Sequence, residues 1–165
     1  MKQLDHDIKF ISKDIFQHFL ANSTKSDAEI ETYSYYEVGY DNSAILKSID
    51  KKGYYLYAFR INQKDSQALI YVGKTHDNSQ RLKRHLQWKK DNGEPYAESY
   101  KCQAKNIQEL LNNRKATLTL CLYNNRELTM ATLLALESSL IANGKGDFEK
   151  KNQQTGLKSW NKRNG

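Results

Sequence analysis

The sequence predicts an α+β domain with a small, largely antiparallel three-stranded sheet flanked by helices. Three observations predict this fold. Two aromatic and β-branched runs flank a short polar segment, a third run alternates between apolar and polar residues, and the segments around them carry apolar residues at helical spacing. The chain has 165 residues, 38% of them hydrophobic, which suffices for one compact domain but hardly for two.

The strands are predicted from composition and alternation. Residues 54–61 and 68–72 are the two β-branched runs, and the polar residues 62–67 between them are typical of the loop of an antiparallel hairpin. In residues 117–123 leucines alternate with mostly polar residues, which predicts a third strand with one buried face. The tyrosine-rich residues 33–40 are compatible with a strand, with a loop that contacts nucleic acid, or with both.

Four segments have the periodicity or the end signals of helices. Residues 5–20 predict an added amphipathic helix at the amino terminus, ending near Asn22. A second helix is expected from the caps Asp77 and Asn78 to about Lys90, and a short one over residues 107–111. The most strongly periodic segment is 127–142, where residues 143–144, Asn and Gly, are predicted to end the helix.

Composition excludes several classes of protein. No stretch approaches the roughly 18 consecutive apolar residues that a membrane span needs, and the amino terminus is charged where a signal peptide would be apolar. We therefore expect a cytoplasmic protein without a membrane partner. Cys102 and Cys121 are too few for a disulfide framework or for a zinc site.

The charge distribution favours a polyanionic partner. The chain carries 26 basic and 19 acidic residues, a net charge of +7, and the bases cluster in residues 81–90 and 145–163. Such tracts fit contacts with phosphates, although lysine-rich faces also keep proteins soluble. The candidate DNA-binding residues in these tracts are Lys83, Arg84, Lys89, Lys90, Lys145, Lys150, Lys151 and Lys158.

Glu137 is an unusual residue for its position. Its neighbours one helical turn away include Leu133, Leu134, Leu140 and Ile141, so its carboxylate is expected within the apolar face. Burial of an ionised carboxylate requires a metal ion, a basic partner or protonation. Two interpretations stay open at this point: a metal ligand, or a glutamate at the edge of the face that reaches solvent or pairs with a core arginine.

A second unusual feature is the sequence Tyr-Val-Gly-Lys-Thr at residues 71–75, followed by Arg81 and His85. On a helix, Arg81 and His85 would lie one turn apart on one face, where both could reach one phosphate. Arginine provides a planar fork of donors for phosphate oxygens, and histidine titrates near neutral pH. A basic surface helix is the commoner explanation of such a pair taken alone.

The order of these segments resembles the GIY-YIG nuclease superfamily. Residues 71–73, Tyr-Val-Gly, match the second half of its name, and the steps of ten residues from Tyr71 to Arg81 and four more to His85 fit its spacing. Residues 136–141 resemble its glutamate helix, and Trp-Asn at 160–161 resembles its closing aromatic-Asn pair. The likeness covers roughly residues 53–163. We therefore divide the chain into a nuclease core, 51–165, and a helical, tyrosine-rich extension, 1–50, packed on it.

Two positions compete for the first tyrosine of the family motif. Gly-Tyr-Tyr at 53–55 has the expected glycine, whereas Tyr-Leu-Tyr at 55–57 lacks it. With the hairpin centred between Lys64 and Asp65, Tyr57 would pair with Val72, next to Tyr71, and Tyr55 would pair with Lys74. This register favours Tyr57 and keeps Tyr55 as the alternative. The chain also departs from some members of the family because no histidine follows His85, and because residues 145–156 resemble a basic insertion.

The resemblance implies a DNA endonuclease that uses one divalent ion, Mg²⁺ or Mn²⁺, held by Glu137. Tyr57 would act as general base or position the water, with positive charge supplied by Lys74, Arg81 and the metal. Arg81 and His85 would neutralise the phosphoryl oxygens. The resemblance also implies that Tyr71 orients the base or the phosphate and that Asn161 braces the site.

The expected substrate is double-stranded DNA, and the expected role is that of a stand-alone restriction-type or phage-type enzyme. A homodimer would allow cleavage of both strands. Two other functions compete with this one: a non-catalytic nucleic-acid-binding module that has kept the fold, and a nuclease toxin.

Overall fold

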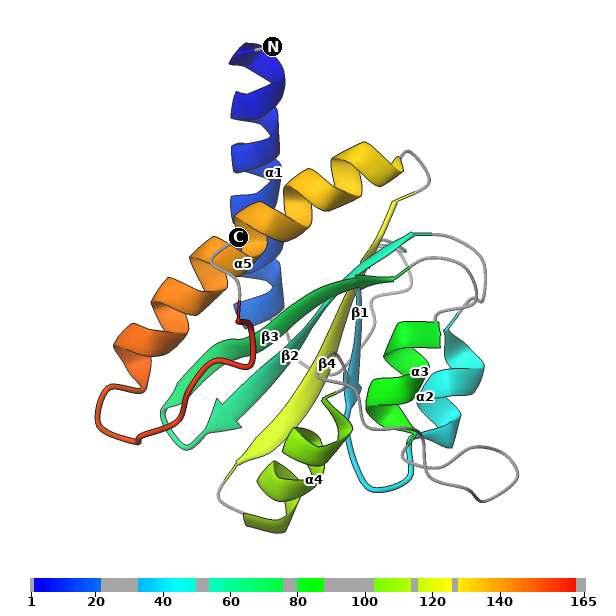
Figure 1. The fold of residues 1–165 in the computed structure, drawn as a ribbon, viewed down its shortest axis with the longest axis vertical. Helices are drawn as coiled ribbons and strands as arrows, with labels where there is room; N and C mark the ends of the chain where they lie inside the picture. Colours follow the sequence, from blue (N-terminus) through cyan, green and yellow to red (C-terminus); the bar gives the residue numbers. More distant parts are fainter. Residues whose placement is uncertain are drawn as a thin grey trace.

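The computed structural model describes residues 2–21, 33–49, 54–75, 80–87, 103–113, 116–125 and 128–162. Four strands and five helices make up these parts of the chain (Figure 1). In chain order they are α1 (Lys2–Ala21), β1 (Tyr33–Glu37), α2 (Ser43–Ser48), β2 (Tyr55–Gln63), β3 (Ser66–Thr75), α3 (Gln80–Leu86), α4 (Ala104–Asn113), β4 (Thr117–Asn124) and α5 (Met130–Lys151).

The α+β class is confirmed, but the expectation of three strands is wrong. The sheet has four strands in the order β1-β4-β2-β3, and every neighbouring pair is antiparallel. The fourth strand is β1, from the tyrosine-rich segment, which pairs with β4 from Tyr33 opposite Tyr123 to Glu37 opposite Thr119. Tyr33 and Tyr35 are buried, so the first fifty residues contribute both a strand and a helix to the same core.

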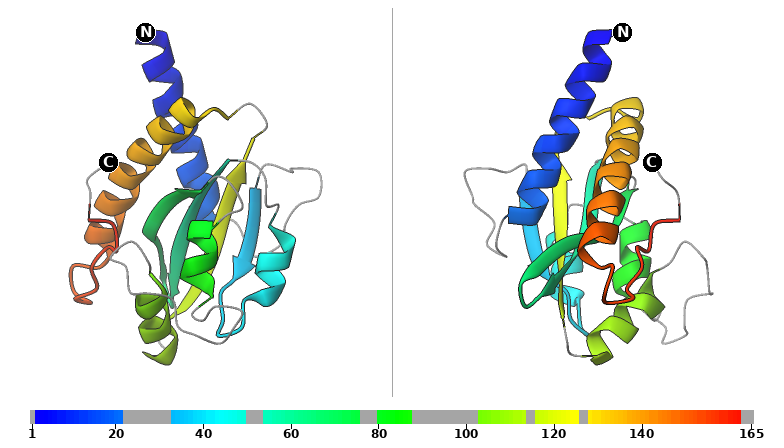
Figure 2. Two further views of the ribbon diagram at one scale, coloured as in Figure 1. Left: turned by 45° about the vertical axis from the view of Figure 1, so that its right-hand side comes forward. Right: turned by 90° about the vertical axis from the view of Figure 1, so that its left-hand side faces the viewer.

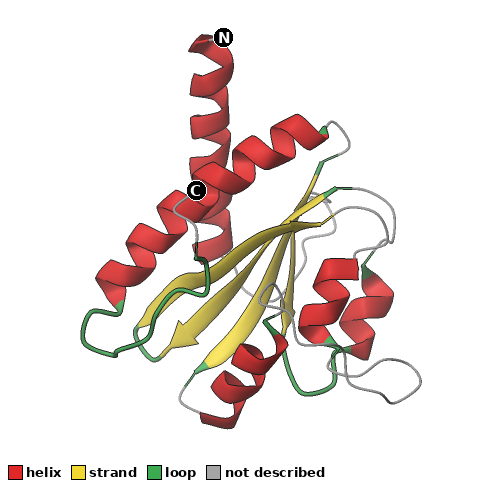
Figure 3. Ribbon diagram, in the orientation of Figure 1, coloured by secondary structure: helices red, strands yellow, loops and turns green. Residues whose placement is uncertain are grey.

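The molecule has three layers. Helices α2, α3 and α4 cover one face of the sheet (Figure 3). We call it the tyrosine face because its core contains Tyr55, Tyr57 and Tyr71. Helices α1 and α5 cover the other face, the aliphatic face, with a core rich in leucine and isoleucine. The amino-terminal part of α1 projects beyond the sheet in all views (Figure 2). No helix among the described residues combines the length and the apolar character needed to span a membrane.

The hairpin of β2 and β3 corrects the expected register. Its turn is only Lys64-Asp65, because the strands extend through residues expected in the loop, to Gln63 and Ser66. From the turn the pairing follows expectation as far as Arg60 opposite Leu69, but the register then shifts by one residue between Phe59 and Arg60. This β-bulge leaves Ile70 as the extra residue.

The bulge decides which side chains meet. Tyr57 lies opposite Gly73 rather than Val72, and Tyr55 lies opposite Thr75 rather than Lys74. Directly opposed residues share a face. In the register without a bulge, Tyr57 would share a face with Val72, and Tyr71 would lie on the other face. The bulge therefore brings Tyr71 onto the tyrosine face together with Tyr57.

Helix α5 is longer than expected. Asn143 and Gly144 do not end it: the helix continues to Lys151, so that residues 145–151 of the expected basic insertion are helical, and a turn follows. A Cβ at Gly144 would lie 3.5 Å from Leu69 and 3.8 Å from Val72, so this glycine lets α5 pack closely on β3. Packing on the sheet thus outweighs the low helix propensity of glycine.

The other helices agree with the sequence pattern in type. Helix α1 is close to its expected bounds, and α4 is longer than the expected 107–111. Helix α3 ends at Leu86, before the expected Lys90, while its expected caps and Lys89–Lys90 lie outside the described residues. Helix α2 was not expected, since its six residues are too short to show a helical period.

Candidate active site

The aromatic rings of Tyr57, Tyr71 and His85 form a cluster on the tyrosine face. The ring centroids lie 6.2 Å apart for Tyr57 and Tyr71, 5.9 Å for Tyr57 and His85, and 5.4 Å for Tyr71 and His85. Phe59 packs against all three rings. Tyr57 and His85 are completely buried, and Tyr71 retains 6% of its exposure. Strands β2 and β3 and helix α3 thus bring together three of the residues that the sequence pattern singled out.

Gly73 explains why glycine follows Tyr-Val in this strand. A Cβ at Gly73 would lie 2.5 Å from the hydroxyl oxygen of Tyr57 and 2.6 Å from its Cζ atom. These distances are shorter than any van der Waals contact, and the buried Tyr57 ring is held on its other sides by Phe59 and His85. Glycine is therefore required here so that the phenol can lie across the β3 backbone.

Two hydrogen bonds hold the His85 ring. The backbone N–H of Gln103 donates to Nδ1 at 2.9 Å, and Nε2 lies 2.9 Å from the Tyr57 hydroxyl oxygen. Both ring nitrogens are thus occupied by protein atoms. In this structure the His85 ring is completely buried and packs against Tyr57 and Tyr71, so that phosphate binding by His85 together with Arg81 stays a prediction.

Burial is the main influence on the ionisation of this cluster. It raises the pKa of Tyr57 well above its usual value of 10.0, and Tyr71 and Glu137 raise it further, whereas the Arg81 charge lowers it. Burial also lowers the pKa of His85 to about 3, with Arg81 acting in the same direction. At neutral pH the cluster therefore contains a neutral phenol and a neutral imidazole.

The charges of Arg81 and Glu137 both act on the Tyr57 hydroxyl. Arg81 is half-buried on α3, and Glu137 is 8% exposed on α5, beside the buried Leu133, Leu136 and Leu140. The predicted burial of the Glu137 carboxylate is confirmed, although Leu134 is 46% exposed and does not belong to the buried face. The rings of Tyr57, Tyr71 and His85 thus form the cluster itself, and charges carried by α3 and α5 act on its phenol.

Lys74 lies on the other face of the sheet from the Tyr57 cluster, whereas Tyr55 lies on the same face. Lys74 lies opposite Leu56, which faces the aliphatic core, so its Cβ is on the other face of the sheet from Tyr57. Lys74 is not among the groups that shift the pKa of Tyr57. Tyr55 lies on the same face as Tyr57 but two residues farther from the hairpin turn.

The segment after α5 fastens the free edge of β3. Asn161 accepts a hydrogen bond from the Val72 N–H at 2.8 Å and donates one to the Val72 carbonyl oxygen at 2.9 Å. The Trp160 N–H donates to the carbonyl oxygen of Ile70, the bulge residue, at 2.8 Å. These contacts cover an edge strand that would otherwise expose its backbone, and they hold β3 at the residues on either side of Tyr71.

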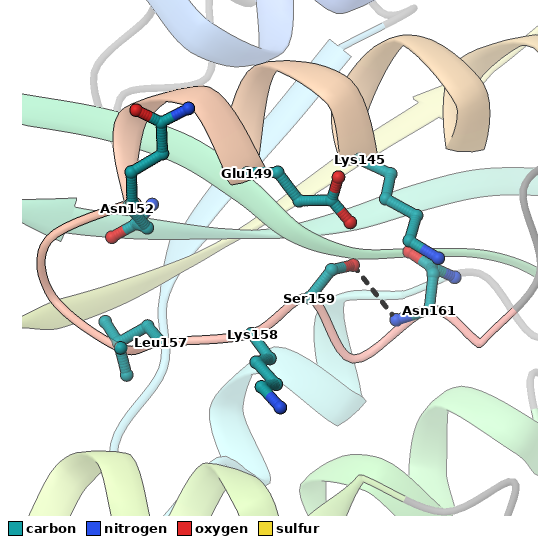
Figure 4. A pocket seen from close by; sticks show the side chains of 9 residues that line it. Lys145, Glu149, Asn152, Leu157, Lys158, Ser159 and Asn161 are labelled. Atoms are coloured by element: carbon teal, nitrogen blue, oxygen red, sulfur yellow. Dashed lines mark hydrogen bonds between the residues drawn. The ribbon is translucent and has the colours of Figure 1, made fainter.

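A surface hollow of about 440 Å³ lies beside this segment. Lys145 and Glu149 extend into it from α5, toward the chain at Ser159 and Asn161 (Figure 4). Lys158 also lines it. Because Asn161 reaches from the hollow to β3, the hollow adjoins the strand that carries Tyr71 and Gly73.

The remaining candidate DNA-binding residues differ in their surroundings. Lys83 is half-buried and Arg84 exposed on α3, and Lys150 is exposed near the end of α5. Lys151 forms a 3.0 Å ion pair with Asp147 and donates at 2.8 Å to the carbonyl oxygen of Gln67, which ties α5 to the hairpin. Lys151 thus has a structural role.

No cluster of three or more potential metal ligands occurs among the described residues. This excludes, for these residues, a site built from several histidine or cysteine ligands of the kind that holds zinc. A magnesium ion needs only one or two carboxylates, because it keeps water ligands and also binds substrate phosphates. The buried Glu137 carboxylate is the kind of oxygen ligand that such a hard cation takes.

Sequence patterns missed Gln103, Phe59 and Ile70, which hold the cluster in place. Gln103 holds His85 through its backbone N–H, and Ile70 is the extra residue of the β-bulge. Neither role depends on the type of side chain, so the sequence does not reveal it. Phe59 could have been found because it lies two residues after Tyr57 in the same strand and therefore on the same face.

In comparisons with known proteins, no family model matches the chain, and neither a curated protein nor a solved structure matches it.

Proposed function

We propose that this chain is a divalent-metal-dependent DNA endonuclease of the GIY-YIG type. The observation that carries the proposal is the buried cluster of Tyr57, Tyr71 and His85, with the charges of Arg81 and Glu137 acting on the Tyr57 hydroxyl. These residues lie up to 80 positions apart in the chain, and they are the ones that the family resemblance selects.

Arg81 is the proposed phosphate-binding residue. It is half-buried, and its charge acts on the Tyr57 hydroxyl. A guanidinium in this position would bind the non-bridging oxygens of the scissile phosphate and stabilise the charge that develops there. In hydrolysis a bond forms between the water oxygen and phosphorus, and the bond from phosphorus to the 3′ oxygen breaks. The water loses a proton, and the 3′ oxygen gains one.

Tyr57 is the proposed residue that orients the attacking water. Because burial raises its pKa, the phenol is protonated at neutral pH. It would act as a general base only after its own proton has moved away, which the Arg81 charge favours. Tyr71 packs against Tyr57 and is 6% exposed, and it is the proposed contact between the buried phenol and the substrate.

Glu137 is the proposed ligand of Mg²⁺ or Mn²⁺, one ion per site. When bound, the ion would supply positive charge next to the departing 3′ oxygen. The proposal explains why a carboxylate is retained among leucines on a buried helix face. It requires only one protein carboxylate, because Mg²⁺ keeps water ligands and also binds substrate phosphates.

The DNA is proposed to lie along Arg81, Lys83 and Arg84 on α3, with one strand passing the hollow beside α5. Lys145 and Lys158 line this hollow, and Asn161 connects it to β3. The net charge of +7 favours encounter with a polyanion.

The test is incubation of purified protein with supercoiled double-stranded plasmid and Mg²⁺, with a chelator in the matched sample. We expect cleavage only with the metal. Discrete fragments would indicate a restriction-type specificity, and a smear would indicate weak specificity. Arg81→Ala should abolish most of the rate, whereas Lys105→Ala, an exposed lysine on α4, serves as the control. Tight DNA binding without any cleavage would overturn the proposal in favour of a non-catalytic module.

A further inference from the structure

The hydrogen bonds of His85 determine which of its nitrogens carries the proton. A backbone N–H can only donate, so the 2.9 Å contact from Gln103 requires Nδ1 to accept with its lone pair. The ring is completely buried, and burial together with Arg81 keeps it uncharged at neutral pH. A neutral imidazole with a free lone pair on Nδ1 carries its single proton on Nε2.

The partner of Nε2 is the Tyr57 hydroxyl, at 2.9 Å. Since Nε2 carries the proton, it donates, and the Tyr57 oxygen accepts. The hydroxyl must then direct its own proton elsewhere. A side-chain hydrogen bond with Tyr71 contributes to the raised pKa of Tyr57, as expected if the Tyr57 hydroxyl donates to Tyr71, because such a bond stabilises the protonated phenol.

We propose that His85 is a positioning residue whose tautomer is fixed by the Gln103 backbone, and that the exit of the Tyr57 proton leads through Tyr71. Hydrogen bonds then run in one direction, from the Gln103 N–H to His85, from His85 to Tyr57, and from Tyr57 to Tyr71. In this arrangement His85 is neither a base for Tyr57 nor a phosphate ligand. The proposal rests on the proposed function for its catalytic meaning.

The fold supports this direction at two points. The β-bulge at Ile70 places Tyr71 on the face of Tyr57, and Gly73 leaves the space in which the Tyr57 hydroxyl meets both partners. The charged and titratable groups that act on the two buried rings are Tyr71 from β3, Arg81 from α3 and Glu137 from α5. Of the three rings that pack against Tyr57 in the contacts given above, Phe59 and His85 are completely buried, whereas Tyr71 is 6% exposed. Tyr71 also carries an exchangeable hydroxyl proton.

The first test is independent of cleavage. The chain has four histidines, and ¹⁵N NMR of histidine-labelled protein reports the tautomer of each, with His85→Gln assigning the signal of His85. We expect His85 with its proton on Nε2 and without titration between pH 5 and pH 8. A proton on Nδ1, or titration near the ordinary value of 6.5, would overturn the proposal and leave the proposed nuclease function standing.

The second test compares two variants in the plasmid assay. The amide nitrogen of glutamine can donate from about the position of Nε2 but cannot accept a proton as a base. His85→Gln should therefore keep kcat within about tenfold of the wild type, whereas His85→Leu, which has no donor, should lose about a hundredfold with KM nearly unchanged. Equal losses in two variants that melt like the wild type would overturn the positioning role. If the wild type cleaves no DNA, the proposed function fails, and the tautomer alone decides the inference.

Discussion

Each face of the sheet buries a network of hydrogen-bonded polar side chains, and the two networks differ in whether their members can exchange protons. On the aliphatic face Arg60 of β2 is 4% exposed. It donates at 2.8 Å to the Phe19 carbonyl oxygen near the end of α1, at 2.8 Å to Asn62, and at 3.5 Å to Thr119. These partners are neutral oxygens, and the arginine stays charged at every pH of interest. Its network attaches α1 to the sheet and stabilises the carboxyl end of that helix.

On the tyrosine face the network consists of groups that can lose or gain protons. His85, Tyr57 and Tyr71 are linked by hydrogen bonds, and the charges of Arg81 and Glu137 act on them. Burial of a polar group alone therefore does not mark a site of chemistry. The distinguishing features of the tyrosine face are hydrogen-bonded groups that titrate and charges of both signs that act on them.

The largest effect is expected for Glu137→Gln, which preserves the shape of the side chain and removes its charge. Cleavage that depends on Mg²⁺ should be abolished while melting temperature and DNA affinity are kept, because the buried carboxylate is the proposed metal ligand. Glu149→Gln, at an exposed position of the same helix, is the control. A large loss of thermal stability would instead indicate a core ion pair, and a stable variant with the wild-type rate would remove Glu137 from the site.

Tyr57→Phe should lower kcat by about a hundredfold or more, because it removes the hydroxyl at the centre of the hydrogen-bonded cluster. Tyr55→Phe, a buried tyrosine on the same face, should have a much smaller effect. Rates from plasmid cleavage check this. Reversed or equal losses would mean that Gly53, Tyr54 and Tyr55 form the family motif; Gly53 lies outside the described residues.

Arg60→Met tests the other face. The variant should lose about 2 kcal/mol of stability, since hydrogen bonds to a charged group are removed from the Phe19 carbonyl oxygen and from Asn62. Chemical unfolding measures this loss, and kcat of the folded fraction should equal that of the wild type. A lower kcat without a loss of stability would show that the two faces are coupled.

Acid should destabilise the protein through His85. Above about pH 6.5 the imidazole is neutral in both the folded and the unfolded chain. Below that pH the unfolded chain binds a proton at His85, whereas the folded chain does not until the pH approaches its pKa of about 3. Stability is therefore lost as pH falls from 6.5 toward 3, by about 2 kcal/mol between pH 7 and pH 5. Urea unfolding at several pH values checks this, and His85→Gln should lack this component.

The smallest effects are expected for Lys145→Ala and Lys158→Ala at the hollow beside α5. Each should weaken DNA binding a few-fold and reduce the slope of log affinity against log salt by about 1, with kcat unchanged. Lys13→Ala, at an exposed position of α1 that does not line the hollow, is the comparison. A flat salt dependence of the wild type would contradict phosphate contact by these residues.

Local patterns in the sequence determined four of the five helices in the described residues, three of the strands and the buried position of Glu137. Apolar periods of 3.6 and 2 fix which face of a helix or strand is buried, whatever the element packs against. For the same reason the burial of Leu133 and Leu140 around Glu137 could be predicted, and so could the grouping of Tyr55 and Tyr57 on one face.

Tertiary contacts decided the rest. The pairing of β1 with β4 joins residues about 90 positions apart, such as Tyr33 and Tyr123. The continuation of α5 through Gly144 depends on the fit against Leu69 and Val72. The bulge at Ile70 turns Tyr71 toward Tyr57, and the Gln103 backbone sets the tautomer of His85. Each of these depends on backbone groups or on close packing between distant segments, which leave no period or motif in the sequence.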